Sequence, residues 1–267
     1  MTNDAATFHR LHADGLLRLP NAWDAGTARV VESLGARAVA TSSAAVAWSH
    51  GYQDGNVLPL QALLFTVSSI ARAVRVPLSV DVEAGYSDDP ARVAETVGAV
   101  IDAGAAGINL EDGAGDPALL CRKIEQVRGA AERRGVKLYI NARTDLYLRP
   151  LVPPEQRVAE ALKRAALYRG AGADGLFVPG ITQAEEIRMV VAGCGMPLNV
   201  MARAGLPSAD ELQALGVRRL SAGSAIAEVV YGRVAALSEG FLKTGSSAPL
   251  LEGAMAYGEI NAMMMPA

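Results

Sequence analysis

The segment Asp102-Ala103-Gly104-Ala105-Ala106-Gly107-Ile108-Asn109-Leu110-Glu111-Asp112 shows the unit from which the fold is built. A helical stretch ends at Gly104, and an apolar strand follows at once and finishes in polar residues. Glycine suits the position after a helix because it adopts the left-handed backbone conformation at little cost. The segment therefore predicts a helix-to-strand junction whose strand carries a carboxylate at its carboxyl end.

The same junction recurs along the chain, with glycine at positions 35, 172 and 216 between a helical stretch and a strand. Hydrophobic periodicity predicts eight strands that alternate with helices of about 10–17 residues. The strands are expected at Leu16–Pro20, Ala36–Ser42, Leu78–Glu83, Gly107–Glu111, Lys137–Arg143, Gly175–Pro179, Leu198–Ala202 and Arg218–Ala222. Eight strand–helix units predict an α/β fold, the (β/α)8 TIM barrel.

The chain length supports one barrel followed by a short tail. The sequence has 267 residues, and a TIM barrel typically takes about 250. We expect residues 1–243 to form the barrel domain and residues 244–267 to form a helical tail, with one helix from Leu250 to Met263. This additional C-terminal helix either caps its own barrel or packs on a neighbouring subunit.

Composition excludes several classes of partner. The net charge is −3, and no concentrated basic surface is evident, as nucleic-acid binding would need. The apolar runs are shorter than the roughly 20 residues that span a bilayer, and no signal peptide is recognised. Cys121 and Cys194 lack the paired spacing of a zinc or redox site. We therefore expect a cytoplasmic protein that binds neither nucleic acid nor membrane.

The predicted strand ends carry polar residues that can act together, because the active site of a TIM barrel lies at the carboxyl ends of its strands. Asp81 and Glu83 are two residues apart and share one face of a strand. Two carboxylates there suit Mg²⁺, which takes one or two protein carboxylates and keeps several waters. The other polar residues at strand ends are Thr41, Ser42, Ser43, Asn109, Glu111, Asp112, Asn141, Arg143, Asp145 and Asn199.

This set of residues can stabilise an enolate. A Mg²⁺ ion held by the carboxylates would polarise a 2-oxo acid, and Arg143 would bind a carboxylate or an oxyanion in a bidentate manner. Ser42 and Ser43 would hold the far carboxylate oxygen. Each residue also has a structural alternative: an ion pair for Arg143, a cap after the strand for the serines, and a buried amide bonded to backbone for Asn199.

A Schiff-base mechanism is disfavoured because no lysine lies near the carboxyl end of a predicted strand.

Five segments, in order, resemble the isocitrate lyase and phosphoenolpyruvate mutase superfamily, including methylisocitrate lyases and carboxyphosphonoenolpyruvate phosphonomutases. The segments are Pro20-Asn21-Ala22-Trp23-Asp24-Ala25, Thr41–Asp54, Asp81-Val82-Glu83-Ala84-Gly85-Tyr86, Asn109-Leu110-Glu111-Asp112 and Asn141-Ala142-Arg143-Thr144-Asp145. The resemblance implies a Mg²⁺-dependent enzyme, with Mn²⁺ as a substitute. Such an enzyme makes or breaks a C–C or C–P bond next to a 2-oxo acid through a pyruvate-type enolate.

The resemblance also implies roles for particular residues. Asp81 would ligate the metal directly, while Glu83, Glu111 and Asp54 would act through waters. The expected catalytic residues are Arg143, Asp54 and Glu111, and the expected substrate-binding residues are Ser42, Ser43, Ala44, Asn199 and Tyr86. The superfamily commonly exchanges its last helix between subunits, so we expect a homo-oligomer, either a dimer or a tetramer.

Two departures bear on the reaction. The lyases carry a lysine/arginine-cysteine-glycine-histidine loop after the fourth strand, whereas this chain runs from Asp112 through Gly113-Ala114-Gly115-Asp116 into a helix. Pro179 stands where methylisocitrate lyases have a glutamate. We expect a lyase-like enzyme that cleaves a C–C bond in a small 2-hydroxy or 2-oxo carboxylate. The alternatives are a phosphonopyruvate hydrolase, a phosphoenolpyruvate mutase, an oxaloacetate decarboxylase, or a non-catalytic 2-oxo-acid-binding protein.

Overall fold

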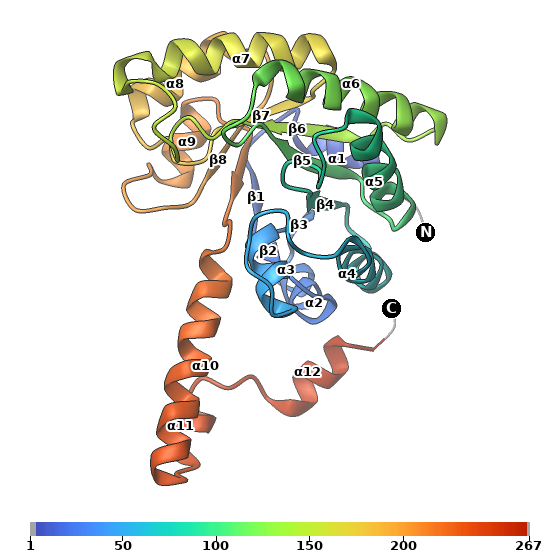
Figure 1. Ribbon diagram of the computed structural model, residues 1–267. Helices are drawn as coiled ribbons and strands as arrows, with labels where there is room; N and C mark the ends of the chain where they lie inside the picture. The colour runs from blue at the N-terminus through green and yellow to red at the C-terminus, as the bar shows by residue number, and fades with distance from the viewer. Residues whose placement is uncertain (1–3, 266–267) are drawn as a thin grey trace.

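The computed structural model describes residues 4–265 and shows a barrel of parallel strands surrounded by helices (Figure 1). The strands follow the order β1-β9-β8-β7-β6-β5-β4-β3-β2. Their bounds are β1 Leu17–Leu19, β2 Asn21–Ala22, β3 Val39–Thr41, β4 Leu78–Asp81, β5 Gly107–Glu111, β6 Tyr139–Arg143, β7 Gly175–Phe177, β8 Leu198–Met201 and β9 Arg219–Ser221. The predicted (β/α)8 TIM barrel is confirmed.

The nine strands occupy eight barrel positions because β1 and β2 are two pieces of one strand. Pro20 alone separates them, and proline has no N–H to donate to a strand ladder. β1 pairs with β9, whereas β2 pairs with β3, so this broken strand joins the two ends of the sheet. A hydrogen bond from the backbone N–H of Gly223 to Oδ1 of Asn21 (2.9 Å) adds a contact at the closure.

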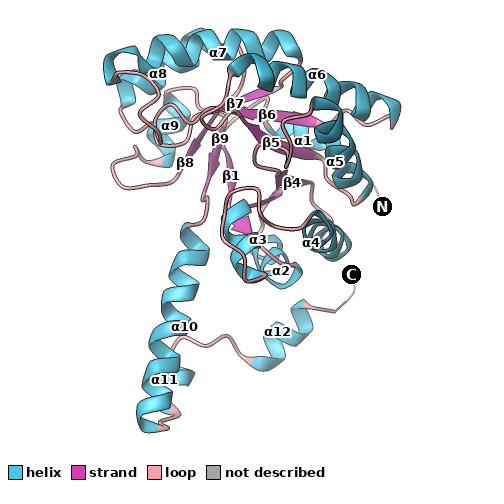
Figure 2. Ribbon diagram, in the orientation of Figure 1, coloured by secondary structure: helices cyan, strands magenta, loops and turns pink. Residues whose placement is uncertain are grey.

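Helices cover the outside of the barrel (Figure 2). Their bounds are α1 Ala5–Leu11, α2 Ala25–Ser33, α3 Ser43–Ser49, α4 Leu60–Ala73, α5 Pro90–Asp102, α6 Pro117–Arg133, α7 Arg157–Ala171, α8 Ala184–Cys194, α9 Ala209–Ala214, α10 Ala225–Thr244, α11 Ala248–Leu251 and α12 Tyr257–Met263, with a 3-10 turn at Pro154–Gln156. The glycines expected at the helix-to-strand junctions, 35, 104, 172 and 216, all have positive φ.

Most predicted strands are shorter in the structure, and two differences from the predicted elements bear on the site and the tail. The strand expected to run from Leu78 to Glu83 ends at Asp81, because the backbone at Glu83 turns into the left-handed region with φ 53°. The single C-terminal helix expected from Leu250 to Met263 is instead the pair α11 and α12, separated by residues 252–256. A glycine at 253 with φ 71° lies in that break.

Strand alternation separates an apolar layer from a polar one. Val80, Ile108 and Ile140 belong to the large core cluster between strands and helices. Their neighbours point the other way, into a barrel interior that carries polar side chains where TIM barrels usually carry branched apolar ones. The buried polar residues on the strands are Asn21, Thr41, Ser79, Asp81, Asn109, Asn141, Asn199, Arg219 and Ser221.

Helix α1 packs on the barrel near the amino end of β6. Phe8 is fully buried, and its ring meets the rings of His12 and Tyr139 edge-on, with centroids 4.7 and 5.4 Å away. His12 stacks on Tyr139 at 4.0 Å. Burial lowers the pKa of His12 to about 3, so this histidine is neutral at physiological pH.

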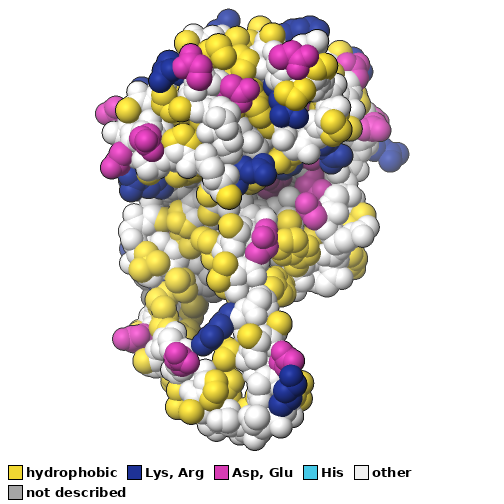
Figure 3. All heavy atoms as spheres, turned by 90° about the vertical axis from the view of Figure 1, so that its left-hand side faces the viewer, with side chains coloured by type: hydrophobic (Ala, Val, Ile, Leu, Met, Phe, Trp, Pro, Cys, Tyr) yellow, Lys and Arg dark blue, Asp and Glu magenta, His cyan; other side chains and the backbone are white. Residues whose placement is uncertain are grey.

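Helix α10 leaves the barrel and projects away from it, and the chain then returns through α11 and α12 (Figure 1). Large apolar side chains on α10 are exposed, among them Val229 (72%), Val234 (54%) and Leu242 (85%). Hydrophobic side chains are visible on the projecting part in Figure 3. Arg29 on α2 donates to the carbonyl of Met263 from Nε (2.9 Å) and Nη2 (2.6 Å), which ties the returning tail to the barrel. Within residues 4–265, no helix combines the length and apolarity that crossing a bilayer requires.

We predict that Phe8→Ala lowers the free energy of unfolding by about 3–5 kcal/mol, because it removes a fully buried aromatic ring and leaves a cavity under the barrel. Urea denaturation measures the change. Phe65→Ala on α4 is the control, since Phe65 is 69% exposed and should change stability little. Equal losses in the two variants would show that α1 does not contribute to the barrel core.

Candidate active site

Asp81 lies at the centre of the candidate site, at the carboxyl end of β4. Its side chain is buried, and each carboxylate oxygen has a donor: Oδ1 accepts from the backbone N–H of Glu83 (3.0 Å) and Oδ2 accepts from Nδ2 of Asn109 (3.2 Å). Burial raises the pKa of Asp81, and the charge of Arg143 acts in the opposite direction. A buried carboxylate with few donors is a ready ligand for a cation.

The loop after β4 is strained where it meets the loop that carries Asn56. In the described chain, the non-glycine residues with positive φ are Asn56 (60°), Glu83 (53°) and Tyr86 (61°), and they contact one another. The backbone N–H of Asn56 donates to Oε2 of Glu83, and Oδ1 of Asn56 accepts from the backbone N–H groups of Ala84 and Tyr86, both at 3.2 Å. Strained backbone of this kind gathers at functional sites.

Tyr86 and Glu83 are coupled through their side chains. The Tyr86 hydroxyl donates to Oε1 of Glu83 (3.3 Å). Burial and the neighbouring carboxylates raise the pKa of Tyr86 far above its ordinary value, so its proton is held firmly. Burial also raises the pKa of Glu83, and the charges of Asp54 and Asp81 act in the same direction. The Oδ1 of Asp81 accepts from the backbone N–H of Glu83, so these two carboxylates are neighbours, and the grouping of Asp54 with them stays a prediction.

Arg143 lies between two carboxylates at the end of β6. Its Nη1 is 2.9 Å from Oε2 of Glu111 on β5, and it binds Asp145 through Nε (2.7 Å) and Nη2 (3.2 Å). Burial raises the pKa of Glu111 to about 8, although the charge of Arg143 opposes that shift. The guanidinium is therefore held by ion pairs, and the bidentate pair with Asp145 fixes its plane.

A buried network beneath Asp145 supports this arrangement. Asp112 accepts from the backbone N–H of Asp145 at Oδ1 (3.3 Å), and its Oδ2 accepts from Nη1 of Arg164 (2.8 Å) and from the Tyr168 hydroxyl. Arg164 also donates to the hydroxyl of Thr144 (3.2 Å). Both Arg164 and Tyr168 lie on α7, so this helix orients the loop after β6 through Asp112.

The remaining expected residues have structural partners of their own. Ser42 caps α3 by accepting from the backbone N–H of Ala45 (3.4 Å), and Ser43 and Ala44 form the first turn of that helix. The Asn199 amide donates to the backbone carbonyl of Val200 (2.7 Å), while its Oδ1 accepts from Nδ2 of Asn141 (3.0 Å). Asn199 would have to give up one of these bonds to reach a substrate. Its role at a substrate stays a prediction.

A cavity of about 250 Å³ opens beside Glu111. Its lining includes Asn56, Gly113 and Lys123, and the short loop after β5 forms one wall. Lys123 on α6 is buried, and its Nζ donates to the carbonyl of Ala84 (2.8 Å), which links α6 to the loop after β4. The expected absence of a long loop before α6 is confirmed, because only residues 112–116 separate β5 from that helix.

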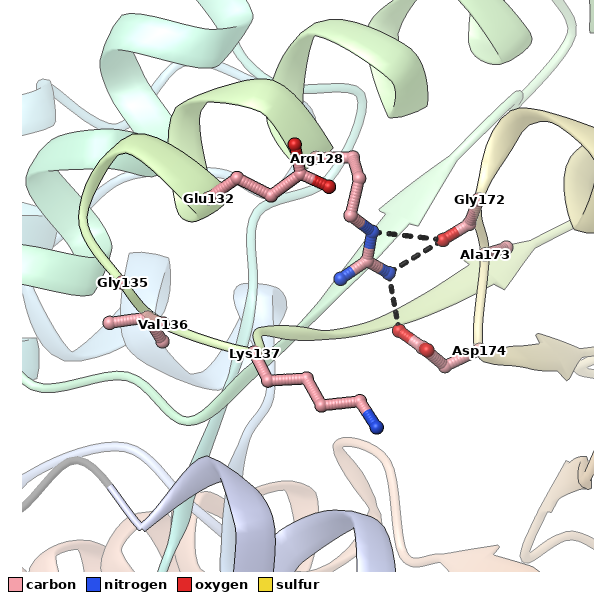
Figure 4. A pocket seen from close by; sticks show the side chains of 8 residues that line it. All are labelled: Arg128, Glu132, Gly135, Val136, Lys137, Gly172, Ala173 and Asp174. Carbon is pink, nitrogen blue, oxygen red and sulfur yellow. Dashed lines mark hydrogen bonds and ion pairs between the residues drawn. The ribbon is translucent and has the colours of Figure 1, made fainter.

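A larger hollow lies at the opposite end of the barrel, before β6 and β7, and has a volume of about 520 Å³ (Figure 4). Arg128 crosses it and donates to the Gly172 carbonyl from Nε (3.2 Å) and to Asp174 from Nη2 (2.5 Å). These contacts clip the turn before β7 to α6. Residues at this end of a TIM barrel usually serve stability, and we assign this hollow no chemistry.

Comparison with known proteins identifies the family of the chain. The family model for phosphoenolpyruvate phosphomutase matches residues 8–242. The chain belongs to the isocitrate lyase and phosphoenolpyruvate mutase superfamily. An uncharacterized protein of Mycobacterium tuberculosis is 35% identical over 223 residues, which cover 82% of each chain. An oxaloacetate decarboxylase of Bradyrhizobium sp. is 29% identical over 262 residues, which cover 91% of this chain and 85% of the relative.

Solved structures of the superfamily align over nearly the whole chain. A protein of Burkholderia cenocepacia J2315, provisionally assigned as a phosphonomutase, is 41% identical with a TM-score of 0.84 over 89% of this chain and 100% of that one. A 2,3-dimethylmalate lyase is 25% identical with a TM-score of 0.85, covering 98% and 95% of the two chains. The superfamily thus includes lyases and mutases that act on small carboxylates, and the chain has the fold of an enzyme.

The described residues offer a hard divalent cation one buried carboxylate and not a complete set of protein ligands. Among residues 4–265, no three His, Cys, Asp or Glu side chains are grouped so that they alone could hold a metal ion. Glu83 and Glu111 contact Asn56 and Arg143, so Asp81 stays the predicted direct ligand. A Mg²⁺ ion that takes one carboxylate and keeps its waters needs no more than this.

Glu111 provides a pH test of the site. Because its pKa is raised, Glu111 keeps a proton in the folded protein that the unfolded chain releases. The contribution of this proton to the stability of the fold is complete below the ordinary pKa near 4.5 and is lost as the pH rises toward about 8. In chelator, we expect the melting temperature of the wild type to fall between about pH 5 and pH 8 more steeply than that of Glu111→Gln. Parallel curves for the two proteins would contradict the burial of this carboxyl.

Proposed function

We propose that the protein is a Mg²⁺-dependent lyase-like enzyme that cleaves a C–C bond in a small 2-hydroxy or 2-oxo carboxylate and releases a pyruvate-type enolate. The observation that supports this most directly is the buried Asp81 carboxylate at the end of β4 together with the partly buried Arg143 guanidinium at the end of β6, whose charge opposes the raised pKa of Asp81. A ligand-binding carboxylate and a fixed cation on one barrel rim suit a substrate that develops negative charge.

In this proposal Asp81 holds the metal directly, and Glu83, Glu111 and Asp54 orient its waters. Bound there, Mg²⁺ supplies positive charge for the developing enolate oxygen, with Mn²⁺ as a substitute. Arg143 binds the carboxylate of the substrate after exchanging its ion pair with Glu111, which is within reach because that contact involves Nη1 alone. In the same proposal, the hydroxyl of Ser43 and the backbone of Ala44, which begin α3, bind the other end of the keto acid.

Decarboxylation of oxaloacetate is the second candidate. The relative named oxaloacetate decarboxylase aligns over 91% of this chain, whereas a 2-methylisocitrate lyase of Halalkalibacterium halodurans aligns over 69% of this chain and 62% of its own length, at 27% identity. Decarboxylation of oxaloacetate leaves a pyruvate enolate, whereas cleavage of a 2-methylmalate-type substrate releases pyruvate as the ketone and leaves the negative charge on the other carboxylate fragment. A metal and Arg143 that bind the 2-oxo or 2-hydroxy acid would serve either reaction. Assay of pyruvate formation from oxaloacetate and from 2-methylmalate-type substrates separates them.

The shared site can be tested before the substrate is known. Oxalate mimics the pyruvate enolate, and we expect it to bind the wild type only when Mg²⁺ is present, measured by calorimetric titration. Asp81→Ala should weaken this binding at least about tenfold, because it removes the direct ligand. Asp210→Asn on α9 is the control, since that side chain is 96% exposed. Binding without metal, or binding retained in Asp81→Ala, would refute the proposed metal site.

We also propose that the protein assembles as a homo-oligomer in which α10 packs on a second copy. A groove of about 650 Å³ on the barrel is lined by apolar residues of β1 and α2, including Leu17, Val30 and Leu34, together with Ile226 at the start of α10. Several large apolar residues of α10, among them Val229, Val234 and Leu242, are exposed in the described chain. An apolar helix and an apolar groove on the same molecule favour reciprocal exchange between copies.

We expect light scattering to show a dimer or a tetramer for the wild type. Val234→Asp should shift the protein toward the monomer, because it buries a charge in the proposed contact. Lys243→Asp places the same side chain at an exposed polar position of α10 and should leave the assembly intact. A monomeric wild type would refute the exchange of α10.

A further inference from the structure

Arg219 is a charged residue enclosed inside the barrel. It lies on β9 with 1% of its surface exposed, and its Nη2 donates to Oγ of Ser79 (3.3 Å) and to Oδ1 of Asn109 (3.2 Å). Within the described chain, Nε and Nη1 have no hydrogen-bond partner, and no ion pair includes this residue. Arg219 therefore carries a buried positive charge that makes polar contacts through one nitrogen.

The guanidinium of Arg219 is covered by an aromatic ring on one side, and its polar contacts are made to the strands of the barrel. Phe8 covers it from α1, with the guanidinium carbon 5.8 Å from the ring centroid. Burial lowers the pKa of Arg219 to about 10, against the effects of Tyr139 and of the Asp81 carboxylate, so the side chain stays charged at neutral pH. Because a buried cation is costly without a partner, the hydrogen bond from Arg219 to Asn109 on β5 stabilises the folded protein.

Asn109 connects this charge to the candidate metal ligand. Its Oδ1 accepts from Arg219 and from Nδ2 of Asn141 (2.9 Å), and its Nδ2 donates to Oδ2 of Asp81 (3.2 Å). Two donors on Oδ1 fix the amide so that its NH₂ group faces the carboxylate. Hydrogen bonds of this kind orient the direct ligands of a metal and tune its affinity.

We propose that Arg219 is a positioning residue for Asp81, acting through Asn109 to hold the carboxylate in the orientation that metal binding needs. Its effect on metal rests on the proposed function, whereas the link from Arg219 to Asp81 exists in the metal-free protein. Ser79 offers a matched control, because it is the other partner of Nη2 and, within the described residues, makes no hydrogen bond to the Asp81 side chain.

The first measurement is Mn²⁺ binding followed by electron paramagnetic resonance, which needs no substrate. Arg219→Met should weaken binding on the order of tenfold or more, Arg219→Lys should recover part of the loss, and Ser79→Ala should bind as the wild type does. Wild-type or tighter Mn²⁺ binding by Arg219→Met would overturn the proposal, since it would show that the buried charge only repels the cation.

The second measurement uses the metal-free protein. Asp81→Asn is introduced into the wild type and into Arg219→Met, and the melting temperatures of the four proteins form a cycle. The shift caused by Asp81→Asn should differ between the two backgrounds by about 2 °C or more. Additive shifts would overturn the link between Arg219 and Asp81, whether or not the wild type binds Mn²⁺. Failure of the wild type to bind Mn²⁺ would by itself refute only the proposed function. If Arg219→Met does not fold, Arg219→Lys takes its place in the cycle.

Discussion

The hydrogen-bonded column inside the barrel is the constraint on which the rest of the structure depends. It runs from Asn199 through Asn141 and Asn109 to Asp81, and Arg219 joins it from below. Asn109 and Asn199 accept at Oδ1 and donate from Nδ2, and Asn141 donates from Nδ2 to both of them, so turning one amide over would leave buried donors or acceptors unpaired. Such a network is stable only when it is nearly complete, which ties the geometry of the rim to strands on the far side of the barrel.

The desolvation cost of this column is offset because the opposite face of each strand is apolar. Val80, Ile108 and Ile140 alternate with the polar residues and pack against the helices. Burial of this outer layer offsets the desolvation of the interior. The site is thus supported from two directions: amides inside the barrel hold Asp81, while Arg164 on α7 reaches Asp112 from outside and holds the loop of Arg143 and Asp145.

The sequence was enough to predict the eight strand positions and the glycines that open them, because both follow from local periodicity and backbone preference. It also indicated the carboxylates and the arginine at the rim. It could not predict that Glu83 leaves the strand in a left-handed turn, since that depends on the contact of Glu83 with Asn56, 27 residues away. Arg219 likewise looked like an ordinary residue at the start of a strand, and only the register of β9 brings it under Asn109.

The short connection between β5 and α6 has a consequence for the timing of the reaction. Residues 112–116 are tied by a hydrogen bond from Gly115 to Asp112 (2.7 Å) and leave no segment long enough to fold over the rim. This connection therefore cannot close over the rim, and its opening cannot delay departure of a product. An enolate left open to water there would take its proton on either face, so a methylene already labelled stereospecifically with tritium would give pyruvate with a racemic methyl group in deuterated solvent.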